Sequence, residues 1–266
     1  MTAVDELETG WLPSTPVDDT LLRAFLRNQA ALNALVADAG HGHVHDDDLV
    51  SVADAGSPVA YQNQAVLHRP LRTVDDPALD VAETHLCSGR SATLLSAWPT
   101  PDLRSRGWHL VGHPAFVVRG PVAATQAPHP RHPGLEIHVA DCADDLAVAE
   151  DLMVRGYPVP EAIGAPRGSA FPADLLETPV LVRVCSIDGV PVAVAASLPM
   201  HGVVNLCLAA TLPEARHRGA WTALVDDRCG DVPHLPAAAF TSDDSRPGFV
   251  RAGFLPVVRF TLWLRP

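Results

Sequence analysis

The sequence contains no lysine: its 19 basic residues are all arginines, against 31 acidic residues in 266 positions. The absence of lysine excludes a lysine nucleophile and a Schiff-base mechanism. A net charge of −12 and a pI of about 5.4 do not favour binding to a nucleic-acid backbone. No run approaches the roughly 18 apolar residues of a membrane span, and no signal-peptide pattern opens the chain. We therefore expect a cytoplasmic protein with no membrane contact.

Cysteine is sparse, and no Cys-x-x-Cys pair occurs. The five cysteines are Cys87, Cys142, Cys185, Cys207 and Cys229. Their scatter argues against a zinc ribbon or a dithiol redox site. Most lie in apolar runs, so we expect small buried thiols in a reducing compartment.

Apolar residues, at 47% of the chain, are numerous enough to build a full core. The segment Gly120–Gly134 is rich in proline and has almost no apolar periodicity, so it is the best candidate for a linker. We therefore predict two domains, residues 1–130 and 135–266, with residues 1–19 as a loose lead-in.

The first half has the apolar spacing of mixed helices and strands. Helices are predicted at Leu21–Ala37 and Ala78–Leu86, with a short one within Pro99–Gly107. Strands are predicted at Leu49–Ala53, Val59–Leu67 and Ser91–Ala97, and two within Trp108–Arg119. Residues 41–48, which hold His41, His43 and His45 before three aspartates, are predicted to form a loop.

The second half predicts the order β-α-β-β-β-α-β-α-β. The strands are Leu135–Val139, Val180–Ile187, Val190–Leu198, Val203–Thr211, Ala237–Thr241 and Phe254–Leu264. The helices are Asp141–Arg155, Thr222–Cys229 and Ser245–Arg251. Asp188-Gly189 between two of the strands is a strong hairpin signal.

A basic, glycine-containing turn lies between the run Val203–Thr211 and the following helix. Its residues are Arg216-His217-Arg218-Gly219-Ala220-Trp221. The amide groups at a helix N-terminus, together with the helix dipole, favour an anion. Arginine side chains add donors that suit phosphate oxygens. The turn is therefore a candidate phosphate site.

This turn resembles the pyrophosphate loop of the GNAT superfamily of acyl-CoA N-acyltransferases. Downstream, Phe249-Val250-Arg251-Ala252-Gly253-Phe254 resembles that family's Tyr-x-x-x-Gly-Phe segment. The two motifs stand in the family's order on the predicted elements. The first half, through Trp98-Pro99 and Leu103-x-x-x-Gly107-Trp108, more weakly resembles the degenerate half of two-domain bacterial GNAT proteins. The resemblance implies an α/β fold: a tandem of GNAT-like mixed sheets flanked by helices.

The resemblance also implies a function, the transfer of an acetyl or other acyl group from acyl-CoA to an amine of a small molecule. The pyrophosphate would be bound by the loop Arg216–Ala220 with its neighbour Trp221. The pantetheine arm would lie in a V-shaped gap between Val203–Thr211 and Ala237–Thr241. An amide within Ala209–Leu212, a segment that includes the predicted cofactor-binding residues Ala210, Thr211 and Leu212, would bind the acyl carbonyl. His217 is the candidate base, and no metal cofactor is expected. The sequence leaves room for a homodimer.

Two residues depart from the family pattern. Trp221 stands where the family has a small residue, and its indole either packs on the first half or plugs the cofactor site. Phe249 replaces the tyrosine that protonates the departing thiolate, and a phenyl ring has no proton to give. Two further functions therefore stay open. One is a transferase with a non-CoA donor, such as aminoacyl-tRNA or a carrier protein, and the other is a catalytically inactive binding module.

Other polar residues have weaker claims to function. His41, His43 and His45 with the following aspartates could bind a metal, but solvated surface histidines are commoner. His201 and His234 are further candidate bases, because histidine titrates near neutrality. Glu214, Asp243 and Asp244 are interpreted as solvated carboxylates, any of which could hold an amine.

Overall fold

The computed structural model describes residues 20–86, 89–121, 133–157 and 159–266. The predicted lead-in, Cys87 and most of the predicted linker lie outside these ranges. The four cysteines within them are free thiols, three of which are buried or half-buried and one, Cys142, exposed. None of the helices in this part of the chain combines the length and the apolar character that a membrane span requires.

The first sheet has six strands in the order β1-β2-β3-β4-β13-β5. They are β1 (His43–Asp46), β2 (Val50–Asp54), β3 (Asn63–Leu67), β4 (Ala92–Ser96), β5 (His109–Gly112) and β13 (Thr261–Arg265). Helix α2 (Pro77–His85) connects the parallel strands β3 and β4. Strand β1 corrects part of the predicted loop at 41–48, because residues 43–46 pair with β2.

The second sheet has seven strands in the order β12-β6-β11-β10-β9-β8-β7. They are β6 (Ala115–Arg119), β7 (Leu135–Val139), β8 (Leu181–Ile187), β9 (Val190–Met200), β10 (Val203–Thr211), β11 (Ala237–Thr241) and β12 (Leu255–Arg259). The helices of this half are α3 (Ala143–Gly156), α4 (Ala220–Cys229) and α5 (Arg246–Arg251). Only β10 and β11 are parallel neighbours. The sheet is therefore mixed and mostly antiparallel, which confirms the mixed sheet that the resemblance implies.

Short 3₁₀ helices and tight turns complete the described fold. The 3₁₀ helices are η1 (Ala60–Gln62), η2 (Arg104–Arg106), η3 (Pro160–Ala162), η4 (Ala173–Glu177) and η5 (Pro213–Ala215). The first of them replaces the beginning of the predicted strand Val59–Leu67. Asp188 and Gly189 have left-handed φ values of 53° and 76°, which a two-residue type I′ hairpin turn requires. The predicted hairpin is confirmed.

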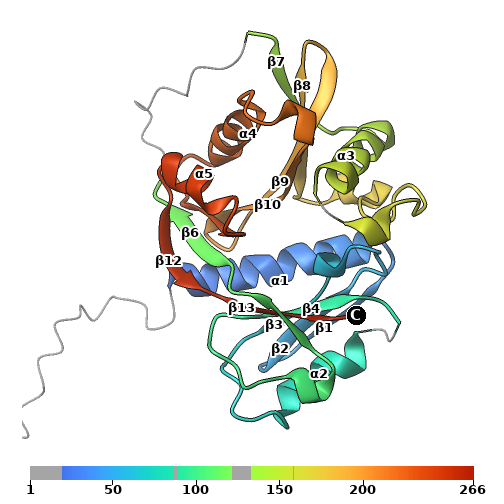
Figure 1. The fold of residues 1–266 in the computed structure, drawn as a ribbon, viewed down its shortest axis with the longest axis vertical. Helices are drawn as coiled ribbons and strands as arrows, with labels where there is room; N and C mark the ends of the chain where they lie inside the picture. Colours follow the sequence, from blue (N-terminus) through green and yellow to red (C-terminus); the bar gives the residue numbers. More distant parts are fainter. Residues whose placement is uncertain (1–19, 87–88, 122–132, 158) are drawn as a thin grey trace, which may run out of the picture.

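A two-stranded ribbon runs from one sheet into the other (Figure 1). At one end β13 pairs with β5, and at the other end β12 pairs with β6. Between them the Phe260 amide donates a hydrogen bond to the Pro114 carbonyl over 2.9 Å. The single strand predicted at Phe254–Leu264 is therefore corrected to two strands in different sheets. The chain bends at Phe260 because that ring is fully buried beside Phe25 and Phe116. Both predicted halves contribute strands to both sheets.

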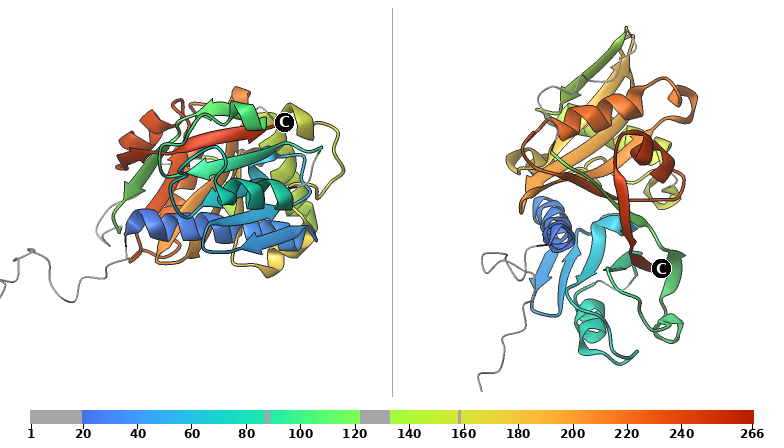
Figure 2. Two further views of the ribbon diagram at one scale, coloured as in Figure 1. Left: turned by 90° about the horizontal axis from the view of Figure 1, so that it is seen from below. Right: turned by 90° about the vertical axis from the view of Figure 1, so that its left-hand side faces the viewer.

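Helix α1 (Leu21–Ala39) lies between the two sheets (Figure 2). Its N-cap Thr20 accepts a hydrogen bond from the amide of Arg23, as an exposed helix start requires. The side-chain amide of Asn28 donates to three carbonyls at the β9–β10 turn, those of Leu198, Met200 and Val203. A helix of the first half is thus fastened to the second sheet.

Candidate functional site

The gap between β10 and β11 is the first feature of the candidate site. The two strands pair only at Val204–Ala237 and Asn205–Ala238, although β10 continues to Thr211 and β11 to Thr241. The V-shaped opening that the resemblance implies is therefore confirmed. Backbone groups beyond the last pair face the gap instead of a neighbouring strand.

A bulge in β10 widens this gap. The register between β10 and β9 shifts between Cys207 and Ala210, and Leu208 has a left-handed φ of 47°. A non-glycine residue in this region costs about 1–3 kcal/mol, and such strain concentrates at functional sites. The bulge releases backbone groups of Leu208 and Ala209 from the ladder. This places polar backbone atoms in the part of β10 where the resemblance implies an acyl-carbonyl site.

The N-terminus of α4 lies at the outer end of the gap. Its N-cap residue Gly219 has a left-handed φ of 89°, and no side chain caps the helix. A Cβ atom at Gly219 would meet no atom within 4 Å. The amides of the first turn, Ala220 to Thr222, are therefore available to an anion, as the helix dipole favours.

One cavity of about 960 Å³ connects these features. It reaches from the first turn of α4, along the bulged part of β10, to α1 and η1 of the first half. Ala210, Thr211, Arg216, His217, Gly219, Ala220, Trp221 and Phe249 all line it. Of the predicted site residues, Leu212 and Arg218 are not part of its described lining. Leu212 is instead buried in the core beside Ala215 and Ala220. The volume of the cavity and the mixture of polar and apolar residues in its wall suit an organic ligand.

The two arginines of the predicted phosphate loop are engaged elsewhere. Arg216 donates to the carbonyl of Gly156 over 3.2 Å and to that of Thr211 over 3.4 Å. Arg218 points toward the β8–β9 turn, where its guanidinium lies 3.8 Å from the carboxylate of Asp188. Between them His217 has a left-handed φ of 63°, which turns successive side chains in different directions. A phosphate group at this turn would therefore meet mainly backbone amides.

The indole of Trp221 packs on α5. A Cβ atom added at Gly248 would lie 3.0 Å from the indole Cη2 atom, so only glycine fits there without a shift. The indole also meets the Phe249 ring edge to face, with centroids 4.9 Å apart. The expectation that the indole packs on the first half is therefore wrong, because it packs on α5 of the second half. Trp221 is also part of the cavity wall.

The family's tyrosine position is apolar here, and the chain's phenols lie elsewhere in the same cavity. Phe249 is 6% exposed and packs on Trp221 and Phe254. The chain has only two tyrosines, Tyr61 and Tyr157. Both line the cavity, and their rings meet edge to face at 6.2 Å. Burial raises the pKa of Tyr61, and the neighbouring Tyr157 raises it further. The scarcity of tyrosine is the only signal that the sequence gives for this pair.

Buried amides join the two halves at the base of the V. Asn205, which is 1% exposed, donates to the side-chain oxygen of Gln29 on α1. Gln29 in turn donates to Asn33 and Gln64, and Gln64 donates to Thr93 on β4. Such a connected network is rigid, since breaking any member leaves a buried polar atom unpaired. It fixes the position of β10 at the point where the strands diverge.

The other candidate bases and carboxylates are distributed unevenly. Only His217 among the three histidines lines the cavity; His201 and His234 are outside its described wall. Asp243 and Asp244 both line it. The guanidinium of Arg259 accounts for the lowered pKa of Asp243, with Arg246 adding to it. Glu214 lies 3.6 Å from Arg155, outside the described wall.

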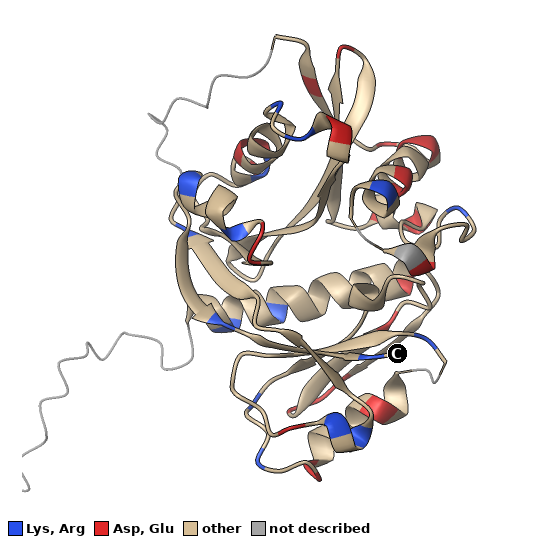
Figure 3. Ribbon diagram, viewed as in Figure 1, with Lys and Arg blue, Asp and Glu red and all other residues tan. Residues whose placement is uncertain are grey.

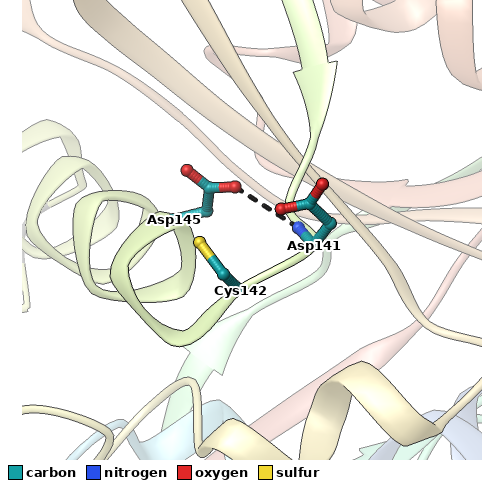
Figure 4. Close-up of side chains that lie close together, drawn as sticks. All are labelled: Asp141, Cys142 and Asp145. Carbon is teal, nitrogen blue, oxygen red and sulfur yellow. Dashed lines mark hydrogen bonds between the residues drawn. The ribbon is translucent and has the colours of Figure 1, made fainter.

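Two groups of metal-ligand side chains have structural explanations. Near α3, Asp141, Cys142 and Asp145 lie close together (Figure 4). The Asp145 carboxylate accepts a hydrogen bond from the Asp141 amide, which lowers the pKa of Asp145. In β1, His43 contacts His85 over 2.7 Å and His45 stacks on the same ring. These imidazoles form a stack: within the described residues, only the group near α3 brings three ligand atoms within 4.8 Å.

No protein-family model and no curated protein matches the sequence, but solved structures match the fold. A GCN5-related N-acetyltransferase from Kribbella flavida has a TM-score of 0.58 and 20% identity, covering 91% of this chain and 95% of its own. Another from Sphaerobacter thermophilus has a TM-score of 0.53 and 13% identity, covering 91% of this chain and 94% of its own. These similarities show that the chain has the fold of the GNAT superfamily of N-acetyltransferases.

Proposed function

We propose that the protein is an N-acyltransferase that moves an acyl group from an acyl-CoA thioester to an amine of a small molecule. One observation carries the proposal. The bulged, splayed strand β10 and the uncapped N-terminus of α4 open into the same cavity. These are the two parts that such a donor needs, one for its pyrophosphate and one for its acyl carbonyl.

The residues present fit a phosphate group at α4. The first turn offers its amides, no side chain competes for them, and the space at Gly219 is open. The hydroxyl of Thr211 on the cavity wall is buried and has no hydrogen-bond partner, so a donor's polar arm can satisfy it. Arg216 then acts as a positioning residue that holds the loop against the end of α3.

The reaction forms a carbon–nitrogen bond and breaks the carbon–sulfur bond of the thioester. The ammonium form of the acceptor first loses a proton, either to water or to His217 on the cavity wall. Freed amides near Leu208 and Ala209 stabilise the oxygen of the tetrahedral intermediate. The departing thiolate takes a proton from Tyr157, because Phe249 has none to give and the pKa of Tyr61 is raised by burial.

The acceptor enters from the side of the first half. That wall of the cavity is formed by Gln29 and Asn33 of α1 and by Tyr61. It holds neutral polar groups, which suit hydroxyl or amide substituents of a small amine. In this view the second half binds the donor, and the first half shapes the acceptor pocket.

A donor carried on tRNA is less well supported. In Figure 3 the arginines of the described residues are scattered among acidic residues over both halves. The overall charge of −12 points the same way. The inactive binding module differs from the proposal only in turnover, so it is separated by assay.

Calorimetric titration with CoA and with acetyl-CoA tests the proposal. We expect saturable binding of both ligands, followed by release of free thiol when a panel of small amines is added with acetyl-CoA. Binding without thiol release for any amine supports the inactive module. Absence of binding overturns the CoA-dependent proposal and leaves the non-CoA donor.

A further inference from the structure

A buried arginine, Arg228, is among the residues that line the cavity beside the bulge. Arg228, in the last turn of α4, is 1% exposed and lines the cavity. Its Nε donates to Leu224, and its Nη1 donates to the carbonyls of Ala196 and Cys207 over 3.0 and 3.4 Å. Its Nη2 atom is buried and has no hydrogen-bond partner.

Within the described part of the chain Arg228 has no carboxylate at ion-pair distance, although Asp231 favours its charged form electrostatically. The neighbouring buried arginine, Arg183, takes the available carboxylates, because it pairs with both Asp227 and Asp231. Arg228 has only carbonyl partners. Burial lowers its pKa to about 10, so it remains protonated at neutral pH. Buried charges in proteins are normally paired, and an unpaired donor at a cavity wall calls for an anionic partner.

The position of Arg228 identifies which part of a donor it meets. It lies eight positions after Ala220, which is about 12 Å along the helix axis. A pyrophosphate at the first turn of α4 therefore cannot also contact it. Arg228 adjoins the bulge instead, through the carbonyl of Cys207 next to Leu208. The group that comes to this point is the acyl group whose carbonyl the bulge amides hold.

We infer that Arg228 is a specificity-determining residue and that the acyl group of the donor ends in a carboxylate, as in a short dicarboxylic acyl thioester. This rests on the proposed function. The carboxylate accepts a charge-assisted hydrogen bond from the free Nη2 position, while the thioester carbonyl stays at the bulge. Arg228 takes no part in bond formation: the amine attacks the thioester carbon and the thiolate leaves, as for any acyl group.

The test compares two thioesters of similar chain length on the full chain. Succinyl-CoA carries the terminal carboxylate, and pentanoyl-CoA replaces it with an alkyl end. We expect at least tenfold tighter binding of succinyl-CoA, since a charge-assisted hydrogen bond contributes about 1.5–3 kcal/mol, or roughly 10- to 150-fold. Arg228→Gln should abolish this ratio, and Arg228→Lys should retain part of it.

Arg183→Gln is the matched control. It removes an equally buried guanidinium that lies outside the described cavity wall, so stability falls but the succinyl-to-pentanoyl ratio should stay. The ratio of the unaltered chain decides the matter even if both glutamine variants unfold. Equal binding of acetyl-, pentanoyl- and succinyl-CoA overturns this inference alone. Absence of binding by all three overturns the proposed function as well.

Discussion

The two halves contain the same arrangement with opposite outcomes at the helix N-terminus. In each, a helix connects two parallel neighbouring strands: α2 between β3 and β4, and α4 between β10 and β11. The N-terminus of α2 is capped by Asp76, whose carboxylate accepts from the amide of Ala78 and is held by Arg69. The N-terminus of α4 begins at Gly219 and has no side-chain cap. In the first half, the carboxylate of Asp76 therefore occupies the helix N-terminus at which an anion could otherwise bind.

The parallel strand pairs of the two halves also differ: β3 and β4 stay together, whereas β10 and β11 separate. Strands β3 and β4 are joined by three register pairs, and Gln64 and Thr93 from the two strands are hydrogen-bonded to each other. Every residue of both strands is buried. Strands β10 and β11 separate after two pairs. A half that closes both positions with its own side chains keeps the fold and gives up the ligand site.

Removing the carboxylate of Asp76 should produce the largest effect on stability. Asp76→Ala leaves Arg69 and the first turn of α2 unpaired, and Asp76 is 3% exposed. Breaking such a pair costs about 2–3 kcal/mol, measured as a lower midpoint in urea. Thioester binding should be unchanged, because α2 lies outside the described cavity wall. A loss of binding at unchanged stability would show that the two helix ends do not play separate roles.

Acid should act through the same carboxylate. Arg69 and backbone amides hold the pKa of Asp76 well below its usual range. Its contribution is therefore present above about pH 4, the value of the unfolded chain, and is lost as pH falls further. Asp76→Ala should consequently unfold with a flatter pH dependence than the unaltered chain between about pH 4 and pH 2.

Placing a carboxylate at the N-terminus of α4 should weaken donor binding. Gly219→Asp brings a negative charge to the first turn of α4, where we propose the pyrophosphate. Aspartate tolerates the left-handed backbone better than most residues, and the space is open. We expect CoA affinity to fall about 30-fold or more, roughly 2 kcal/mol, in a calorimetric titration.

Gly253→Asp is the control for this substitution. Gly253 has a left-handed φ of 84° and equally open surroundings, but it lies outside the described cavity wall. It should retain CoA affinity with a similar small loss of stability. Equal losses of affinity in both variants would trace the effect to the backbone rather than to charge at α4.

The sequence predicts the local features of this comparison better than the long-range ones. The motifs locate the α4 turn, and the apolar runs locate most elements within a few residues. The ribbon of β5–β6 with β12–β13 is not predictable in this way, because the bend at Phe260 depends on burial between Phe25 and Phe116. Likewise, the directions of Arg216 and Arg218 follow from the left-handed backbone at His217. The sequence gives no signal for Arg228, because the relevant observation is the missing hydrogen-bond partner of its Nη2 atom in the folded chain.

The tyrosine pair allows a test of how the halves cooperate. Tyr61 belongs to the first half and Tyr157 to the second, and both line the cavity. Tyr157→Phe should lower kcat about 100-fold, because it removes the proposed proton donor, with little change in KM for the thioester. Tyr61→Phe should have a smaller effect. Unchanged kcat in both variants would assign thiolate protonation to water.

The smallest effect is expected at the other end of α2. His85 stacks on His45 and contacts His43, so β1 covers this end of the helix. Burial lowers the pKa of His85, and the neighbouring histidines lower it further. The stack therefore stabilises the fold above about pH 6.5 and loses that contribution as pH falls through the lowered value. Between pH 7 and pH 5 the melting temperature of the unaltered chain should fall by on the order of 1 °C more than that of His85→Gln. An identical pH profile for the two proteins would show that the histidine stack does not contribute to stability and that, of the two ends of α2, only the one capped by Asp76 does.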